Sequence, residues 1–215
     1  MSPPIPFVPF RRFAPVRFYQ SNRIPHWRQD ECTYFVTFRL GDALPEAICK
    51  KIEGERNQWL ADRGGAFERL SEPQIQEYER RFGGLLDESL DRGSGSCALK
   101  IPELRAVIQE AIAYLDKSKA RMGDFVIMPN HVHALMTPLE GFKLEETLQS
   151  LKGFTARAIN RISGKAGSLW QRDSYDRIVR DGAELAHFQD YIANNPVTAR
   201  LDEHAFTHVR AVYEW

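Results

Sequence analysis

The chain has 215 residues, of which 43% are hydrophobic, a length that builds one globular domain with a real core but leaves no room for a second enzyme. Its 29 basic and 29 acidic residues give a formal charge of zero, so binding to nucleic acid would have to use a local patch. The scattered cysteines, Cys32, Cys49 and Cys97, argue against a zinc ribbon and favour a reducing compartment. Because no apolar run is long enough to span a membrane, we expect a cytoplasmic protein without a membrane partner.

Prolines recur among aromatic and arginine residues throughout residues 1–25, which predicts an extended N-terminal arm that is neither helix nor sheet. Residues 26–215 are expected to form a single domain. Within it, residues 33–40 alternate β-branched and aromatic side chains and predict a strand at the centre of a sheet. A helix that opens at residues 44–46 with a proline in its first turn should stop at the glycine pair 64–65.

A second, charge-rich helix is expected from about residue 71 to residue 86 or beyond, followed by a loop of glycine and serine at residues 91–97. A third helix begins near residue 101, because apolar residues recur at helical spacing between residues 104 and 115. Residues 71–97 thus predict a helical hairpin on the surface of the domain.

Two short apolar runs, residues 124–128 and 131–137, are separated by a Pro-Asn pair and predict a β-hairpin. An amphipathic helix should cover residues 144–162. A last helix should run from residue 181 or 182 to residue 194 and end there, because a residue that precedes a proline disfavours the α conformation. The order of strand, helix, helix, strand, strand and helix is compatible with a ferredoxin-like α+β sandwich built on an antiparallel sheet.

The second run of this hairpin carries two histidines, His131 and His133. Successive side chains of a strand alternate between faces, so the two imidazoles should point the same way while Val132 points into the opposite layer. Together they would form a two-nitrogen chelate for a metal ion. The alternative is a pair of ordinary polar residues at a sheet surface, the commoner role of a His-x-His pattern.

The segment Met128-Pro129-Asn130-His131-Val132-His133 resembles the His-hydrophobic-His signature of HUH-type single-strand DNA transposases, specifically the REP-associated tyrosine transposases and their insertion-sequence relatives. The resemblance runs from about His26 to Leu201. It implies a ferredoxin-like fold with helices on one sheet face and the metal site and DNA on the other, and it marks residues 66–100 as an insertion seen in one branch. The blocks that agree with it in order and spacing are Ser168–Arg172, Tyr175–Asp181 and Tyr191–Ala199.

Tyr191 and Asn195 lie four residues apart, so on a helix they share one face. A helix docked over the histidine strand would bring a hydroxyl and an amide oxygen to the same ion. The resemblance implies that Tyr191 is the nucleophile and that Asn195 completes the metal site with His131 and His133. Tyr175 is the main rival nucleophile, and Asn195 is also placed to act as a helix cap.

Two imidazoles alone hold a metal weakly, so a third protein ligand is expected, with positions left open for phosphate oxygens. Ligand softness would favour Zn, Ni or Co, whereas the resemblance implies a divalent metal of the harder kind, Mg or Mn. The ion would polarise the scissile phosphate. Attack by tyrosine would then leave a 5′-phosphotyrosine and a free 3′-hydroxyl, as the resemblance implies.

Seven basic residues stand against two acidic ones between Leu151 and Arg180, which gives this segment the local excess that the whole chain lacks. Arginines here would hold phosphates while an aromatic side chain stacks on an unpaired base. The alternative is a core tryptophan beside a salt-bridged surface. The resemblance implies hairpin-forming single-stranded DNA as the partner of a monomer or homodimer. The candidate DNA-binding residues are Lys152, Arg157, Arg161, Trp170, Arg172, Arg177 and Arg180.

The leading hypothesis is a metal-dependent DNA endonuclease and strand-transfer enzyme of transposase type. A domesticated hairpin-binding protein of the same fold that does not cleave is disfavoured by the intact histidines, tyrosine and asparagine. A metal hydrolase without a DNA substrate is disfavoured by the basic segment and by the lack of a helical His-Glu-x-x-His. Arg200 stands where relatives commonly carry glycine, so the turn after the last helix is expected to differ.

Overall fold

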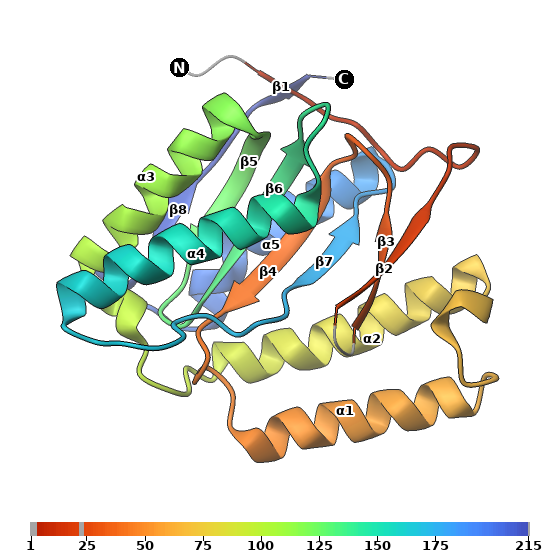
Figure 1. Ribbon diagram of the computed structural model, residues 1–215, viewed down its shortest axis with the longest axis horizontal. Coiled ribbons are helices and arrows are strands. Elements are labelled where there is room, and N and C mark those ends of the chain that lie inside the picture. Colours follow the sequence, from red (N-terminus) through yellow and green to blue (C-terminus); the bar gives the residue numbers. More distant parts are fainter. Residues whose placement is uncertain (1–3, 22–23, 215) are drawn as a thin grey trace.

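The core of the protein is a five-stranded antiparallel sheet, seen in a computed structural model that describes residues 4–21 and 24–214 (Figure 1). The strands stand in the order β7-β4-β6-β5-β8, and every neighbouring pair runs antiparallel. β4, predicted to be central, lies between β7 and β6. The strands are β4 (Tyr34–Arg39), β5 (Ala120–Ile127), β6 (His131–Pro138), β7 (Tyr175–Ile178) and β8 (Thr207–Val209).

Helices α3 (Pro102–Ser118) and α4 (Leu144–Ser163) cover one face of this sheet, in front of the strands in Figure 1. Together with β4, β5, β6 and β7 they give the chain order β-α-β-β-α-β and the strand order of a ferredoxin-like unit. Alternate strand residues such as Val36, Val132 and Ala134 form the core with the two helices. The predicted α+β class with an antiparallel sheet is therefore confirmed.

Helix α5 (Gly182–Thr198) packs on the opposite face, behind the sheet in Figure 1, and is the exception to the expected arrangement of helices on one face. The reason is that the second set of alternate residues also contains buried apolar side chains, among them Phe35 and Leu135. Phe35 of β4 lies 4.3 Å from Phe188 of α5, ring centroid to centroid, in a stacked contact. Leu135 and Ile192 belong to the same buried cluster.

Helix α5 also runs past the predicted end at residue 194 and includes Pro196. The preference against helix before a proline is a bias, and here a buried Asn195 and Pro196 outweigh it. Hydrogen bonds resume beyond the proline, since Ala199 N donates to Asn195 O at 3.0 Å. Arg200 then turns the chain with a φ of 52°, a left-handed conformation that glycine adopts more easily.

A helical hairpin stands between β4 and α3, formed by α1 (Glu46–Ala61) and α2 (Glu72–Asp91) at the bottom of Figure 1. An aromatic cluster that includes Trp59 and Tyr78 joins the two helices. Both helices lie where the sequence predicted them, and α2 falls within residues 66–100, whose assignment as an insertion stays a prediction. Short 3-10 turns at Phe67–Arg69, Ala98–Lys100 and Glu203–Ala205 lie in the connections.

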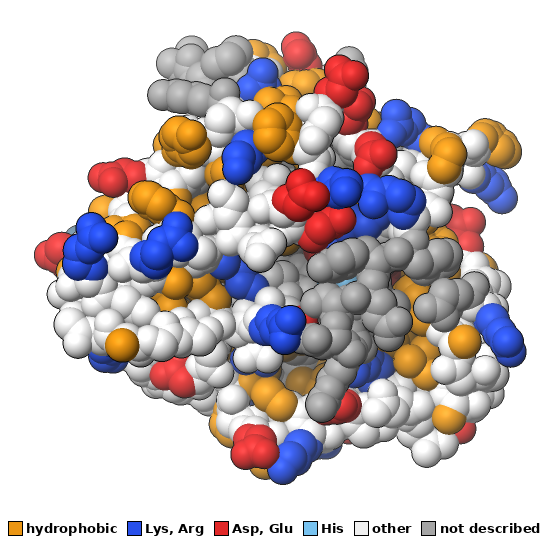
Figure 2. All heavy atoms as spheres, in the orientation of Figure 1, with side chains coloured by type: hydrophobic (Ala, Val, Ile, Leu, Met, Phe, Trp, Pro, Cys, Tyr) orange, Lys and Arg blue, Asp and Glu red, His pale blue; other side chains and the backbone are white. Residues whose placement is uncertain are grey.

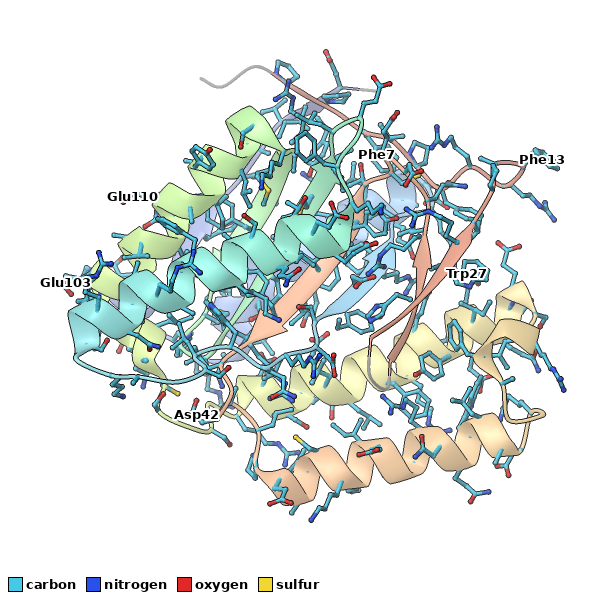
Figure 3. The ribbon with its side chains drawn as sticks, in the orientation of Figure 1. Phe7, Phe13, Trp27, Asp42, Glu103 and Glu110 are labelled. Carbon is cyan, nitrogen blue, oxygen red and sulfur yellow. The ribbon has the colours of Figure 1, made fainter. Side chains whose placement is uncertain are left out.

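The N-terminal segment contains short strands, contrary to the expected arm without sheet structure. β1 (Ile5–Pro6) pairs in parallel with β9 (Tyr213–Glu214), and β2 (Arg17–Ser21) pairs with β3 (Ile24–Arg28). The residues between the prolines keep their backbone donors; Phe10 N, for example, donates to Val179 O at 2.9 Å. Phe13 is 98% exposed at the outer tip of this segment (Figure 3). Across the described residues, no helix is long and apolar enough to cross a membrane.

Candidate catalytic site

The two histidines of β6 lie side by side on the face that α5 covers. Both are 0% exposed, and their ring centroids are 4.5 Å apart. The Nδ1 atom of His133 shares a hydrogen bond of 2.8 Å with the Thr37 hydroxyl on β4. The Nδ1 atom of His131 pairs with Asn130 Oδ1 at 2.7 Å. Because Oδ1 can only accept, His131 carries its proton on Nδ1 and keeps a lone pair on Nε2.

The Nε2 atoms of both histidines are buried and, within the described part of the chain, have no hydrogen-bond partner. Burial lowers the pKa of His131 to about 3 and that of His133 well below its ordinary value. Both imidazoles are therefore neutral and able to ligate. A buried polar atom without a partner costs about 1–3 kcal/mol, so two together on one strand need an explanation such as a metal ion.

Helix α5 brings Tyr191 and Asn195 to the same place, as their spacing predicted. The Tyr191 ring stands edge-on to His133 with centroids 5.2 Å apart. Asn195 is 3% exposed and its Nδ2 donates to the Tyr191 hydroxyl at 3.2 Å. Its Oδ1 is a third buried atom that finds no partner among the described residues. Asn195 thus faces the site and does not serve only as a helix cap.

The donor atoms fit a divalent ion of intermediate hardness. Two neutral imidazole nitrogens and one amide oxygen leave half of an octahedral shell for water or phosphate oxygens. Among the described residues no group of three His, Cys, Asp or Glu side chains could hold a metal, so a third donor beside the two imidazoles would have to be of another kind, such as Asn195 Oδ1. The predicted set of His131, His133, Asn195 and Tyr191 is brought together by β6 and α5.

Sequence reasoning missed two acids of α2, Asp87 and Asp91, which border this group. The Asp87 carboxylate interacts directly with the Tyr191 hydroxyl, and Asp91 interacts with the Asn195 amide. Burial raises the pKa of Tyr191 above its ordinary range, and the neighbouring Asp87 and Asp91 raise it further. The sequence does contain a pattern that could have identified them, because Asp87 and Asp91 are four residues apart, as are Tyr191 and Asn195. What the sequence lacked was the position of α2.

The rival nucleophile Tyr175 on β7 is placed differently. Its hydroxyl donates to the backbone oxygen of Glu79 on α2 at 3.2 Å. A Cβ atom added at Gly83 would lie 2.8 Å from that hydroxyl, so the glycine allows α2 to approach it. Burial raises the pKa of Tyr175 well above its ordinary value, and the charge of Glu79 adds to the shift. Tyr175 therefore packs against α2, while Tyr191 contacts His133 and Asn195.

Arg177 and Arg180, predicted to bind DNA, form ion pairs inside the molecule. Both contact Glu79 of α2, through Arg177 Nε at 3.1 Å and Arg180 Nη2 at 3.3 Å. Arg177 also pairs with Glu184 of α5. The two arginines thus hold α2 and α5 to the edge of the sheet, a role that the sequence did not predict. Their contact with DNA stays a prediction.

Trp170, predicted to stack on a base, is a core residue, so this prediction is corrected. Its side chain is 4% exposed and packs edge-on against Phe38 with ring centroids 5.0 Å apart. The indole nitrogen donates to the Thr155 hydroxyl at 2.9 Å. A tryptophan at this position fills the space between β4 and α4, which is the alternative that the sequence left open.

The other basic residues lie on or beside α4, on the sheet face opposite the histidines. Arg157, Arg161 and Arg172 are exposed. Lys152 donates to the Arg172 backbone oxygen at 2.8 Å, and burial lowers the pKa of its amine to about 8. Figure 2 shows Lys and Arg side chains at separate places on this face, without one continuous cationic surface. The structure therefore does not bring these basic residues to His131, His133 and Asn195.

Lys152 and Arg172 line a cleft of about 540 Å³ between α4 and the strands β3 and β7. Asp176 lies at its base, where Arg28 Nη2 donates to Oδ2 at 3.0 Å and His26 Nδ1 approaches the same oxygen at 2.9 Å. The cleft is thus cationic at its rim and holds a buried ion pair below.

Comparison with known proteins gives a family-model match over the segment that carries these residues, together with similar proteins and a similar solved structure. The family model of IS200-like transposases matches residues 101–195. A Haemophilus influenzae protein named "Putative REP-associated tyrosine transposase" is 30% identical over 99 residues, covering 41% of this chain and 52% of that protein. An uncharacterised protein of the same organism is 32% identical over 107 residues, covering 40% of this chain and 59% of its own length. The chain therefore spans little more than half of these relatives.

A solved structure of a REP-associated tyrosine transposase bound to a REP hairpin aligns over 83% of this chain and 72% of its own, with 16% identity and a TM-score of 0.43. The match to the IS200-like transposase model covers His131, His133, Tyr191 and Asn195, the four residues that the fold brings together.

Proposed function

We propose that the protein is a metal-dependent DNA endonuclease and strand transferase that acts on hairpin-forming single-stranded DNA through a 5′-phosphotyrosine. The observation that carries the proposal is that three buried atoms, which find no hydrogen-bond partner among the described residues, meet beside a tyrosine hydroxyl; they are His131 Nε2, His133 Nε2 and Asn195 Oδ1. The match of residues 101–195 to the IS200-like transposase model and the name of the Haemophilus influenzae relative support it.

In this proposal His131, His133 and Asn195 hold a divalent Mg or Mn ion. When bound, the ion supplies Lewis-acid polarisation of the scissile phosphate. Asn130 and Thr37 orient the two imidazoles through Nδ1, the kind of outer contact that fixes metal-binding histidines. Phosphate and water oxygens would fill the other positions and harden the site, which is why we favour Mg or Mn over Zn.

Tyr191 is the nucleophile of this proposal. Its oxygen forms a bond to phosphorus while the bond from phosphorus to the 3′-oxygen breaks, and the electron pair leaves with that oxygen. Asn195 Nδ2 donates to the tyrosine oxygen and sets its direction, and Phe35 meets the ring edge-on with centroids 5.7 Å apart. Because the number of phosphoester bonds is conserved, the same group can later rejoin a strand.

The exposed cations are the remaining DNA candidates. Arg157, Arg161 and Arg172 can hold phosphates from the face of α4, with Lys152 at the rim of the adjacent cleft. This face is separated from the metal-binding group by the sheet, so a hairpin that reaches both must pass around an edge of the sheet. The proposal therefore assigns α4 to anchoring the DNA and α5 to the chemistry.

The test compares a hairpin carrying a single-stranded flank with a blunt duplex of the same composition, with Mn²⁺ and with a chelator. We expect cleavage of the flank only when metal is present, and hairpin binding that weakens as salt rises. Equal cleavage with the chelator would overturn the metal-dependent mechanism. Tight hairpin binding without cleavage at any metal concentration would support a non-cleaving DNA-binding protein instead.

A further inference from the structure

We propose that α2 completes the catalytic centre, with Asp87 as the acceptor of the Tyr191 proton and Asp91 as the residue that positions Asn195. This inference rests on the proposed function. It adds to the centre an element that lies outside residues 101–195, the segment that matches the family model. The helical hairpin of α1 and α2 would then take part in the reaction.

The first support is the way α2 is fixed to the histidine strand. Asn130 uses Oδ1 to hold His131, and its Nδ2 reaches the end of α2, with Leu90 O and Ser94 O each at 3.2 Å. One buried side chain thus links the orientation of an imidazole to the position of α2. At the other end of the contact, Glu79 of α2 pairs with Arg177 and Arg180. α2 is therefore held at both ends of the site.

The second support is the matching spacing of the facing residues. Asp87 and Asp91 lie one turn apart on α2, as Tyr191 and Asn195 do on α5, so each acid meets one partner. Asp87 faces the tyrosine hydroxyl and Asp91 faces the asparagine amide. The Oδ1 atoms of both acids are buried without a hydrogen-bond partner in the described structure. Such orphaned oxygens are rare unless they have a use.

The third support is that the amide of Asn195 has two sides with different tasks. Its Nδ2 donates to the Tyr191 hydroxyl and lies next to Asp91, whose carboxylate accepts hydrogen bonds. The amide oxygen is thereby turned away from the acids and towards His131, and among the described residues it has no hydrogen-bond partner. Asp91 thus selects which end of Asn195 faces a metal ion, which makes it a positioning residue.

The proton balance of the strand cleavage is then complete. As the Tyr191 oxygen bonds to phosphorus, its proton passes to a carboxylate oxygen of Asp87. The bond between phosphorus and the 3′-oxygen breaks, and that oxygen takes a proton from water to become the free 3′-hydroxyl. On rejoining, the 3′-hydroxyl gives its proton to water as its oxygen bonds to phosphorus, the bond from phosphorus to the tyrosine oxygen breaks, and Asp87 returns its proton to that oxygen. Burial raises the pKa of Asp87 to about 7, close to the value that suits a proton acceptor at neutral pH.

The experiment follows formation of the covalent protein–DNA adduct by Asp87→Asn, with Glu88→Gln as the matched control. Glu88 is the exposed neighbour on the same helix, so both changes remove one negative charge from α2. We expect Asp87→Asn to slow adduct formation by about 10²–10⁴-fold, the contribution of a general base, while Glu88→Gln forms adduct at the wild-type rate. Equal rates for Asp87→Asn and wild type would overturn the proposal, as would faster reaction, which would mean that α2 blocks the DNA.

Chemical rescue of the adduct rate distinguishes proton acceptance by Asp87 from a merely structural role. In Asp87→Ala, added formate should restore part of the adduct rate, because a small carboxylate can enter the space and accept the proton, whereas it cannot restore a lost fold. The pH profile is a second readout. The charged and titratable groups that face Asp87 are Asp91, Tyr191 and Tyr175. The wild-type rate should rise as pH rises through about 7, and the Asp87→Asn rate should not. Absence of both effects would contradict the role.

Asp91 is tested without any DNA. Calorimetric titration of Mn²⁺ into the full chain should show that Asp91→Asn binds the ion about 10–100-fold more weakly, the usual effect of removing an outer contact, while Glu88→Gln binds as wild type does. Unchanged Mn²⁺ affinity would overturn the positioning role. If wild type binds Mn²⁺ in this way but forms no adduct, the proposed function and the proton-accepting role fail together, and the assignment of Asp91 stands.

Discussion

The two faces of the sheet are built from alternate residues of the same strands, yet they differ in kind. The face under α3 and α4 is apolar, with Val132, Ala134 and Met136 of β6 in its core. The face under α5 places His131 and His133 between apolar neighbours such as Leu135 and leaves their Nε2 atoms without partners in the described structure. The face under α3 and α4 therefore stabilises the fold, whereas the face under α5 carries the candidate site at a cost in stability.

Whether a strand residue contributes to stability or to the site thus depends on which face of the sheet its side chain lies on. Each unpaired polar atom on the α5 face costs about 1–3 kcal/mol that an apolar side chain would not. Functional sites often carry such costs. Changes on the α5 face should thus affect activity first, and changes on the α4 face stability first.

The largest expected effect is on activity at the histidines. His131→Ala or His133→Ala should reduce metal-dependent cleavage by at least about 10³-fold, since the ion supplies several kcal/mol of transition-state stabilisation. Met136→Ala, on the face of the same strand that α3 and α4 cover, should instead lower the free energy of unfolding by about 2–5 kcal/mol. Cleavage assays and denaturant titrations measure the two. A histidine variant with wild-type cleavage would remove the distinction between the faces.

The next largest effect is on stability at the buried ion pair of the α4 side. Asp176→Asn should lower the free energy of unfolding by about 3–5 kcal/mol, because Arg28 and His26 lose the buried carboxylate that they share, although Glu145 still pairs with Arg28. Burial alone would raise the pKa of Asp176, but His26 and Arg28 bring it below its ordinary value. The pair therefore stabilises above the unfolded pKa of about 3.9 and loses this effect as pH falls below it.

Acid titration of unfolding tests this sign. The wild type should lose stability between about pH 5 and pH 2 more steeply than Asp176→Asn. Parallel curves for the two proteins would show that Asp176 has the same pKa in the folded and unfolded chains.

The smallest expected effects distinguish Arg172 from Trp170, which the sequence analysis both named as candidate DNA-binding residues. Arg172→Ala should weaken hairpin binding by about tenfold or less and reduce the salt dependence by about one phosphate contact, with stability unchanged. Trp170→Phe should leave DNA affinity unchanged and lower the stability by about 1 kcal/mol, since the indole loses its hydrogen bond to Thr155. Electrophoretic shift assays across a salt series, and thermal unfolding, measure these. The opposite assignment of effects would restore Trp170 as a base-stacking residue.

The sequence predicted what depends on spacing within one element. Strand and helix periods predicted that His131 and His133 point the same way and that Tyr191 and Asn195 share one face. The β-branched and aromatic residues of β4 predicted its central place in the sheet. The ferredoxin-like order followed from the succession of elements. β7 was missed as a strand because charged residues alternate along it.

What the sequence could not predict is which elements meet. Arg177 and Arg180 were predicted to bind DNA because the residues around them in the sequence do not show that Glu79, far away in the chain, pairs with both. Trp170 was grouped with exposed arginines although its neighbours in space are Phe38 and Thr155. The two acids of α2 were overlooked for the same reason, since their partners lie on α5.

The central claim is that Tyr191 attacks DNA on the α5 face, and the most direct test is to find the residue that carries the DNA. Incubation with a hairpin substrate and Mn²⁺, denaturation and peptide mapping should place the nucleotide on Tyr191, because a phosphotyrosine bond survives unfolding. Tyr191→Phe should bind the hairpin but form no adduct, and Tyr175→Phe should form it. DNA found on Tyr175, or cleavage by Tyr191→Phe, would contradict the account.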